Sequence, residues 1–174
     1  MREGSERSLK GSPVQNVHER VFRAPLSAVG DLLDGLASPS DALWPRDRWP
    51  PVRFDRPLGV GAKGGHGPIR YTIEAYEPGR SIRFRFDAPR GFEGTHAFDV
   101  EEVAPGAVRL RHTLSMRARG WARLSWPLLF RPLHDALVED ALDRAEVSFQ
   151  VPSAGPRQWP RRVRALRRAA SYLR

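Results

Sequence analysis

The sequence contains no cysteine, which excludes disulfide bonds, a thiolate nucleophile and any cysteine-ligated metal site. Lysine is almost as scarce, because it occurs only at Lys10 and Lys63. The longest strongly apolar run, WPLLF (126–130), is far short of the roughly 20 residues that a membrane-spanning helix requires. The polar start MREGSERSLKGSP lacks the apolar core of a signal peptide. We therefore expect a soluble, cytoplasmic protein.

Positive charge is concentrated at the C-terminal end. Residues 152–174 contain seven arginines and no acidic residue, so that only +2 of the net charge of +9 belongs to the rest of the chain. The preference for arginine over lysine, with abundant Ala, Gly and Pro, is typical of a GC-rich bacterial genome. A length of 174 residues predicts one domain. We expect a disordered N-terminal segment (1–13), a domain (14–150) and a basic tail (151–174).

The N-terminal part of the domain predicts a strand, a helix and a loop. VQNVHERVFRAP (14–25) mixes β-branched and polar residues and ends at a proline, as a first strand does. From Pro25 onward, apolar residues recur at helical spacing. The five prolines of residues 37–61 then exclude a long regular element, so we expect an ordered loop with at most one short helix and one short strand. Trp44 and Trp49 of this loop either cover a pocket mouth or plug the core.

The middle and the end of the domain have two different periodicities. Apolar and polar residues alternate in the segments 68–76, 81–88, 92–103 and 107–118. This alternation predicts antiparallel strands with one dry and one solvated face. From 126 to 149 the apolar residues instead follow a helical stripe, and we expect Pro127 and Pro132 to separate or kink its first turn.

The glycines of GVGAKGGHG (59–67) match the G-x-G-x-x-G pattern of dinucleotide-binding turns. That pattern needs a strand before it and a helix directly after it, because the helix N-terminus binds the pyrophosphate. Here the glycines follow a proline-rich stretch and lead into a predicted strand. We therefore interpret them as a flexible or bulged connection between strands, and we expect no cofactor.

The order of these elements resembles the START-like (SRPBCC) superfamily, and within it the polyketide cyclase/dehydrase and lipid-transport family. The resemblance covers residues 14–149. It rests on FRAPLSAVGDLL after the first strand, the hairpin YEPGRSIRFRF (76–86), the paired strands of 92–118 and the helix LFRPLHDALVEDALDRAE (129–146). It implies an α+β, helix-grip fold, in which a curved antiparallel sheet wraps around a long C-terminal helix.

The resemblance also implies that a small hydrophobic or amphipathic molecule, lipid-like or polyketide-like, binds between the sheet and that helix. The candidate ligand-binding residues on the strands are Tyr71, Ile73, Phe84, Phe86, His96, Phe98, Leu110, His112, Leu114 and Met116. Those on the helix are Phe130, Leu133, His134 and Leu137. The competing interpretation is that most of these side chains simply fill a core, since pockets and cores use the same residues.

His96 and His112 fall on the predicted dry face, where an imidazole needs a hydrogen-bond partner. Both point inward if His96 lies opposite Leu114 and Phe98 opposite His112, through a three-residue loop at 104–106. They could be structural or ligand-orienting, act as general acid and base, or bind a metal, and the first interpretation is favoured. No inferred inward strand position carries a carboxylate.

Two carboxylates of the helix, Asp135 and Glu139, are expected to face water or to pair with arginines. We therefore predict no catalytic residue and no metal site, and binding as the function. The enzymatic alternative is a polyketide cyclase, aromatase or dehydratase.

The tail WPRRVRALRRAASYLR (159–174) has the pattern of a basic amphipathic helix. It could fray, dock on its own domain, or contact an anionic membrane surface through residues 157–174. A membrane-associated accessory protein is therefore a third functional class. Nothing in the sequence indicates a nucleic-acid recognition module, so we expect no sequence-specific nucleic-acid partner.

Overall fold

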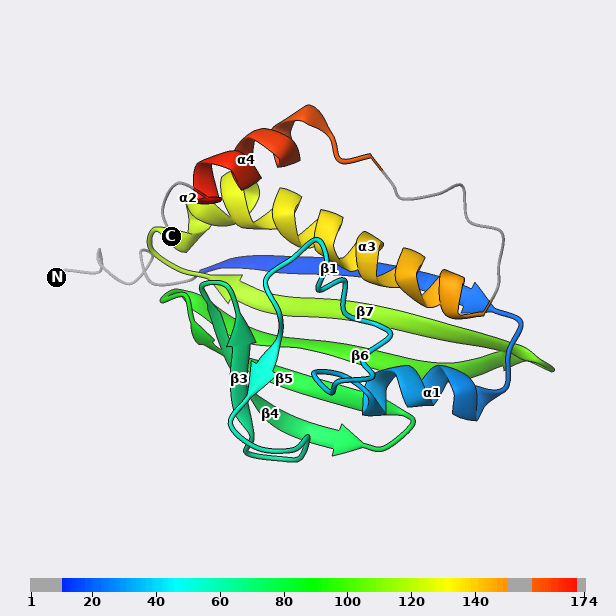
Figure 1. Cartoon of the computed structure of the whole chain (residues 1–174). Coiled ribbons are helices and arrows are strands. Elements are labelled where there is room, and N and C mark those ends of the chain that lie inside the picture. Colours follow the sequence, from blue (N-terminus) through cyan, green and yellow to red (C-terminus); the bar gives the residue numbers. More distant parts are fainter. Residues whose placement is uncertain (1–10, 150–157, 172–174) are drawn as a thin grey trace, which may run out of the picture.

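The segments in which apolar and polar residues alternate form most of a seven-stranded antiparallel sheet in the computed structural model (Figure 1). The structure describes residues 11–149 and 158–171. The strand order across the sheet is β1-β7-β6-β5-β4-β3-β2. In chain order the elements are β1 (Ser12–Phe22), α1 (Leu26–Asp34), β2 (Arg53–Phe54), β3 (Lys63–His66), β4 (Ile69–Glu77), β5 (Ser81–Ala88), β6 (Phe92–Ala104), β7 (Ala107–Ala118), α2 (Ala122–Ser125), the π-helical turn η2 (Trp126–Phe130), α3 (Arg131–Ser148) and α4 (Arg161–Ser171).

The core lies between the sheet and the two helices α1 and α3. Helix α3 runs along the sheet beside β1, while α1 packs over β5, β6 and β7 (Figure 1). The inward positions of the strands are buried together with Leu33 of α1 and Leu142 of α3, both of them 0% exposed. The predicted α+β class, with an antiparallel sheet and a long C-terminal helix, is confirmed.

The register of β6 and β7 is also the predicted one, because His96 lies opposite Leu114 and Phe98 opposite His112. The loop between these strands differs from the prediction. Ala104 pairs with Ala107, so only two residues form the turn, and the register shifts by one residue just before it. The extra residue in this bulge compensates for the shorter turn and leaves the rest of the hairpin in the expected register.

The glycine-rich segment contains a strand of its own, β3, which the sequence analysis missed. β3 leads through a tight turn into β4 and not into a helix, so the glycines lie in and beside a strand, as the expected connection between strands does. Glycine is needed at position 64 because β2 lies too close to leave room for a side chain there. A Cβ atom on Gly64 would lie 2.3 Å from the carbonyl oxygen of Arg53 and 2.4 Å from the ring of Phe54.

The proline-rich loop forms part of the core. It contains β2 as its only regular element among the described residues. Trp44 and Trp49 are 7% and 8% exposed, so they plug the core and do not form a lid. In the C-terminal helical region, η2 separates α2 from α3 in the segment that contains Pro127 and precedes Pro132, as the two prolines predicted.

The basic tail docks on its own domain. Asp140, a buried residue of α3, accepts hydrogen bonds from Trp49 Nε1 (2.7 Å), Trp159 Nε1 (2.9 Å) and Arg48 Nη1 (2.7 Å). Val163 of α4 is 3% exposed and belongs to the main core. Residues 172–174 of the expected helix lie outside the described range. None of the described helices is long and apolar enough to span a bilayer.

Candidate functional site

All five histidines of the chain belong to one row of neighbouring rings that crosses the sheet–helix interface. We call it the histidine row, and its members in spatial order are His66, Tyr71, His96, His112, His134 and His18. The successive distances between ring centres are 5.8, 5.0, 5.5, 5.1 and 6.1 Å. The row extends from the β3–β4 side of the sheet to β1 at the opposite edge.

Strand alternation and register bring these rings together. His96 and His112 occupy inward positions of β6 and β7, and His18 on β1 lies directly opposite His112. His134 reaches the row from α3, where its ring also lies near Trp126. His96 and His112 are diagonal neighbours in the register, since His96 lies opposite Leu114 and His112 opposite Phe98. Side chains at such diagonal positions of neighbouring strands are still within reach of one another when they carry rings.

Several ring nitrogens in this row are buried without a hydrogen bond. His112 Nε2 and His96 Nδ1 lie 3.4 Å apart. The other nitrogen of each ring, and both nitrogens of His134, are buried and have no hydrogen-bond partner among residues 11–149 and 158–171. An unsatisfied buried polar group destabilises a protein by about 1–3 kcal/mol. Such groups are therefore candidates for contact with a molecule from outside the chain.

The buried histidines of the sheet are neutral. Burial, and then the proximity of His134, lowers the pKa of both His96 and His112 well below the ordinary value. Each ring therefore presents one donor and one acceptor nitrogen. Burial also raises the pKa of Tyr71, so that its phenol stays protonated.

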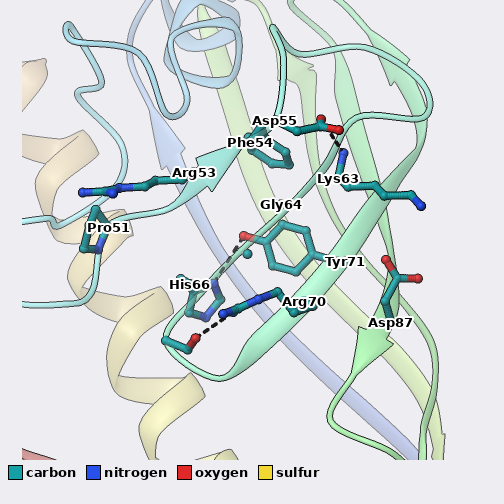
Figure 2. A pocket seen from close by; sticks show the side chains of 12 residues that line it. Pro51, Arg53, Phe54, Asp55, Lys63, Gly64, His66, Arg70, Tyr71 and Asp87 are labelled. Carbon is teal, nitrogen blue, oxygen red and sulfur yellow. Dashed lines mark hydrogen bonds between the residues drawn. The ribbon is translucent and has the colours of Figure 1, made fainter. Parts of the chain in front are cut away.

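An open hollow of about 520 Å³ lies beside the β3–β4 end of the row (Figure 2). Its lining residues are Pro51, Arg53, Phe54, Asp55, Lys63, Gly64, Gly65, His66, Gly67, Arg70, Tyr71 and Asp87. His66 and Tyr71 point toward one another there, with 3.3 Å between Nδ1 and the hydroxyl oxygen (Figure 2). Because Tyr71 also contacts His96, the wall of the hollow is continuous with the buried part of the row.

The predicted ligand-binding residues all lie at the sheet–helix interface, where they pack against one another. Tyr71, Ile73, Phe84, Phe98, Leu110 and Leu137 belong to the main core, with Leu133 at its edge. Leu114 and Met116 belong to a second cluster, with Phe86 and Phe130 packed against it. The imidazole of His96 connects the two clusters, because its ring centre lies 4.8 Å from that of Phe84 and 4.9 Å from that of Phe86.

The sequence analysis missed His18 and His66, and it missed the contacts that two helix carboxylates make with His18. His18 Nδ1 lies 2.6 Å from Glu139 Oε1, and His18 Nε2 lies 3.3 Å from Asp135 Oδ1. The expected pairing with arginine is confirmed for both carboxylates. Glu139 accepts a hydrogen bond from Arg20 (2.7 Å), and Asp135 Oδ2 lies 3.7 Å from Arg131 Nε. His18 and Arg20 alternate in phase with the buried Phe22, but Val17 and Val21 lie on the other face, so the sequence of β1 alone did not mark the inward face.

These contacts favour the charged forms of both His18 and Asp135. The hydrogen bond to Asp135 raises the pKa of His18 against the desolvation of the ring, and Glu139 raises it further. Burial opposes ionisation of Asp135, but His134, His18 and the amide of Asn16 together hold the pKa of this carboxyl well below its ordinary value. The β1 end of the row is thus polar and ionised, whereas its centre is neutral.

No family model matches the sequence, and no curated protein matches it. The fold is similar to that of norcoclaurine synthase from Thalictrum flavum in complex with dopamine and hydroxybenzaldehyde (TM-score 0.61, 13% identity, 88% of this chain and 96% of that one). It is also similar to CalU16 from Micromonospora echinospora (TM-score 0.56, 14% identity, 96% of this chain and 98% of that one). A third similar structure is a conserved protein of unknown function from Enterococcus faecalis (TM-score 0.57, 15% identity, 95% of this chain and 91% of that one). These likenesses confirm the expected helix-grip fold.

Proposed function

We propose that the protein binds a small amphipathic aromatic molecule against the histidine row, with the polar groups of the ligand directed at His96, His112 and His134. The observation that carries this proposal is the set of buried imidazole nitrogens without a partner in the described residues. A hydroxyl or carbonyl group of a ligand would satisfy them, because a neutral imidazole both donates and accepts hydrogen bonds.

The surroundings of the row indicate the class of ligand. Phe84 and Phe86 pack beside His96, and Phe98 packs beside His112, so a flat aromatic body suits this site. A polyketide-like ligand has this combination of rings with hydroxyl and carbonyl groups. The structurally similar norcoclaurine synthase, in complex with dopamine and hydroxybenzaldehyde, supports the same chemical class. The hollow lined by His66 and Tyr71 adjoins the row and would be the entrance for such a ligand.

Two measurements test the proposal. Mass spectrometry of the purified protein, native and then denatured, is expected to release a co-purified aromatic compound. Titration with 4-hydroxybenzaldehyde, which carries one hydroxyl and one carbonyl group, is expected to shift the ring resonances of His96 and His112. Saturable shifts at both rings support the proposal. Shifts confined to exposed residues, together with an empty protein, would overturn it.

The enzymatic alternative, a cyclase, aromatase or dehydratase, makes a different prediction for the same rings. If His96 and His112 orient a ligand, His96→Ala and His112→Ala weaken its binding. If they act as acid and base, the variants keep binding and lose turnover. The contacts of His18 with Asp135 and Glu139 favour testing this alternative, because they supply a histidine–carboxylate pair.

A second candidate function is docking on an anionic membrane surface, which the α2–η2 region favours. Trp121, Leu124 and Leu128 are 76%, 53% and 60% exposed, and we call them the α2–η2 patch. The basic helix α4 lies beside it, because Arg162 donates hydrogen bonds to the carbonyl oxygens of Pro127 and Leu128. An exposed tryptophan and leucines next to arginines are typical of interfacial membrane contacts. A protein that exchanges an apolar ligand with a bilayer needs such a surface.

A further inference from the structure

The β1 end of the histidine row brings two imidazoles and a carboxylate together. His18 Nε2 lies 3.3 Å from Asp135 Oδ1, and His134 Nδ1 lies 3.6 Å from the same oxygen. One ligand atom from each of the three residues lies within 4.8 Å of the other two. We propose that His18, His134 and Asp135 bind a divalent first-row transition-metal ion. This site goes beyond the proposed binding of an aromatic molecule.

The distances fit a metal site before any rearrangement. Bonds of about 2.0–2.1 Å from zinc to nitrogen or oxygen place tetrahedral ligand atoms about 3.3–3.4 Å apart. The two separations that involve Asp135 Oδ1 lie close to this value. Two imidazoles and one carboxylate form a donor set that suits zinc, iron or cobalt, and they leave further coordination positions for water or a ligand.

Neighbouring residues hold two of the three proposed ligands in place through hydrogen bonds, as supporting residues do in known metal sites. Glu139 Oε1 lies 2.6 Å from His18 Nδ1, which places the proton on Nδ1 and leaves the Nε2 lone pair for a metal. Glu139 is itself held by Arg20 Nη2 at 2.7 Å. The amide of Asn16 donates a hydrogen bond of 2.8 Å to Asp135 Oδ1. A carboxylate behind a ligating histidine is a recurrent feature of such sites.

His134 provides an independent reason for an ion. Both of its ring nitrogens are buried and have no hydrogen-bond partner in the part of the chain that the structure describes. Its 3.6 Å separation from Asp135 Oδ1 is too long for a hydrogen bond. An ion between the two would satisfy both groups. The site is reachable from solvent, because the side chain of Asp135 is 36% exposed.

The local charge also favours a cation. From α3, Asp135, Glu139, Asp143 and Glu146 all contact inward-facing residues of β1. From β1, Arg20 is the permanent cation that meets the last three of them, and Arg131 Nε of α3 lies 3.7 Å from the other carboxylate oxygen of Asp135, Oδ2. Four carboxylates thus face two arginines. The opposing interpretation is a network without metal, in which a protonated His18 bridges two carboxylates. The two interpretations differ in whether the protein retains zinc.

The test uses tag-free, full-length protein stripped with a chelator and then dialysed against zinc, with bound metal quantified by elemental mass spectrometry. We expect one zinc ion per chain. We expect Glu139→Gln to weaken binding about 10- to 100-fold, as loss of a supporting residue does, and His18→Gln or Asp135→Asn to weaken it further. Two carboxylate controls away from the triad, Glu93→Gln and Glu101→Gln, should retain the zinc affinity of the parent protein.

A second measurement keeps the proposal falsifiable if a variant folds poorly. Cobalt added to the unsubstituted protein should give visible absorption bands of a four- or five-coordinate ion, and zinc should abolish them. Failure to retain zinc and to produce these bands would overturn the proposal. It would also be overturned if His18→Gln and Asp135→Asn, shown to be folded by circular dichroism, bound zinc as tightly as the controls. Neither result would affect the aromatic-ligand proposal, which is measured at His96 and His112.

Discussion

His18 and His112 lie directly opposite each other on neighbouring strands, yet the protein shifts their pKa values in opposite directions. The hydrogen bond to Asp135 raises the pKa of His18 against the desolvation of the ring. Burial, followed by the nearby His134, lowers the pKa of His112 well below its ordinary value. One step across the sheet thus separates an imidazole whose protonated form is favoured from one that is neutral. The cause is α3, which presents carboxylates to β1.

Acid should destabilise the protein through the buried histidines. The unfolded chain binds protons near the ordinary histidine pKa of 6.5, whereas folded His96 and His112 bind them only at much lower pH. Their contribution to stability is therefore complete above pH 6.5 and declines as the pH falls below it. We expect urea unfolding midpoints to decrease from about pH 7 to about pH 5, and His112→Gln to reduce this decrease.

His18 is the matched contrast for this pH dependence. Because its pKa is raised above 6.5, its contribution is complete below pH 6.5 and is lost as the pH rises through the raised value. His18→Gln should therefore make the acid-induced decrease steeper, opposite to the effect of His112→Gln. Equal effects of the two substitutions would contradict the opposite pKa shifts.

Removal of single imidazoles should weaken ligand binding by a moderate factor. His96→Leu and His112→Leu keep the apolar volume but delete the ring nitrogens, and each should raise the Kd for 4-hydroxybenzaldehyde about 2- to 10-fold, the value of one hydrogen bond. Calorimetric titration measures the change. Ser115→Ala is the control, because Ser115 is an exposed residue of the same strand as His112. A control effect as large as that of His112→Leu would show that strand stability, and not the imidazole, controls affinity.

The buried carboxylate of Asp140 should be essential for docking of the tail. Asp140→Ala removes the acceptor of hydrogen bonds from Trp49, Trp159 and Arg48, and we expect a loss of about 3–5 kcal/mol in the free energy of unfolding. Denaturant unfolding followed by tryptophan fluorescence measures it. Asp47, whose side chain is 64% exposed, provides the control, and Asp47→Ala should change stability by less than about 0.5 kcal/mol.

Membrane docking should require both the apolar and the basic parts of the α2–η2 region. We expect the protein to co-sediment with phosphatidylcholine vesicles that contain phosphatidylserine, and to do so less as salt increases. Trp121→Ser should reduce this binding, and so should Arg161→Glu combined with Arg164→Glu. Val60→Ser is the control, because Val60 is 70% exposed but lies outside the patch. Binding that is insensitive to the first two changes would rule out this surface.

Much of the fold could be predicted because alternation is a local signal. The pattern of β6 and β7 indicated both the buried face and the pairing of His96 with Leu114, since a slip of one residue would expose every apolar side chain. The bulge beside Ala104 could not be predicted, because a two-residue turn with a bulge and a three-residue turn produce the same register. Strand β3 was missed because its glycines allow β2 to approach closely, and a run of glycines does not show the alternation of apolar and polar residues that marks a strand.

The candidate site divides in the same way. The sequence by itself determined that His96 and His112 face the interior, because the apolar residues around them repeat every second position. It could not determine that His18 does so, since β1 carries polar residues on both faces and only the packing of α3 buries one of them. His18 meets Asp135, which lies 117 positions further along the chain, and Asn16 contacts the same residue from 119 positions away. Only the tertiary structure decides such contacts, because side chains of α3 and β1 become neighbours only when the helix packs on the sheet.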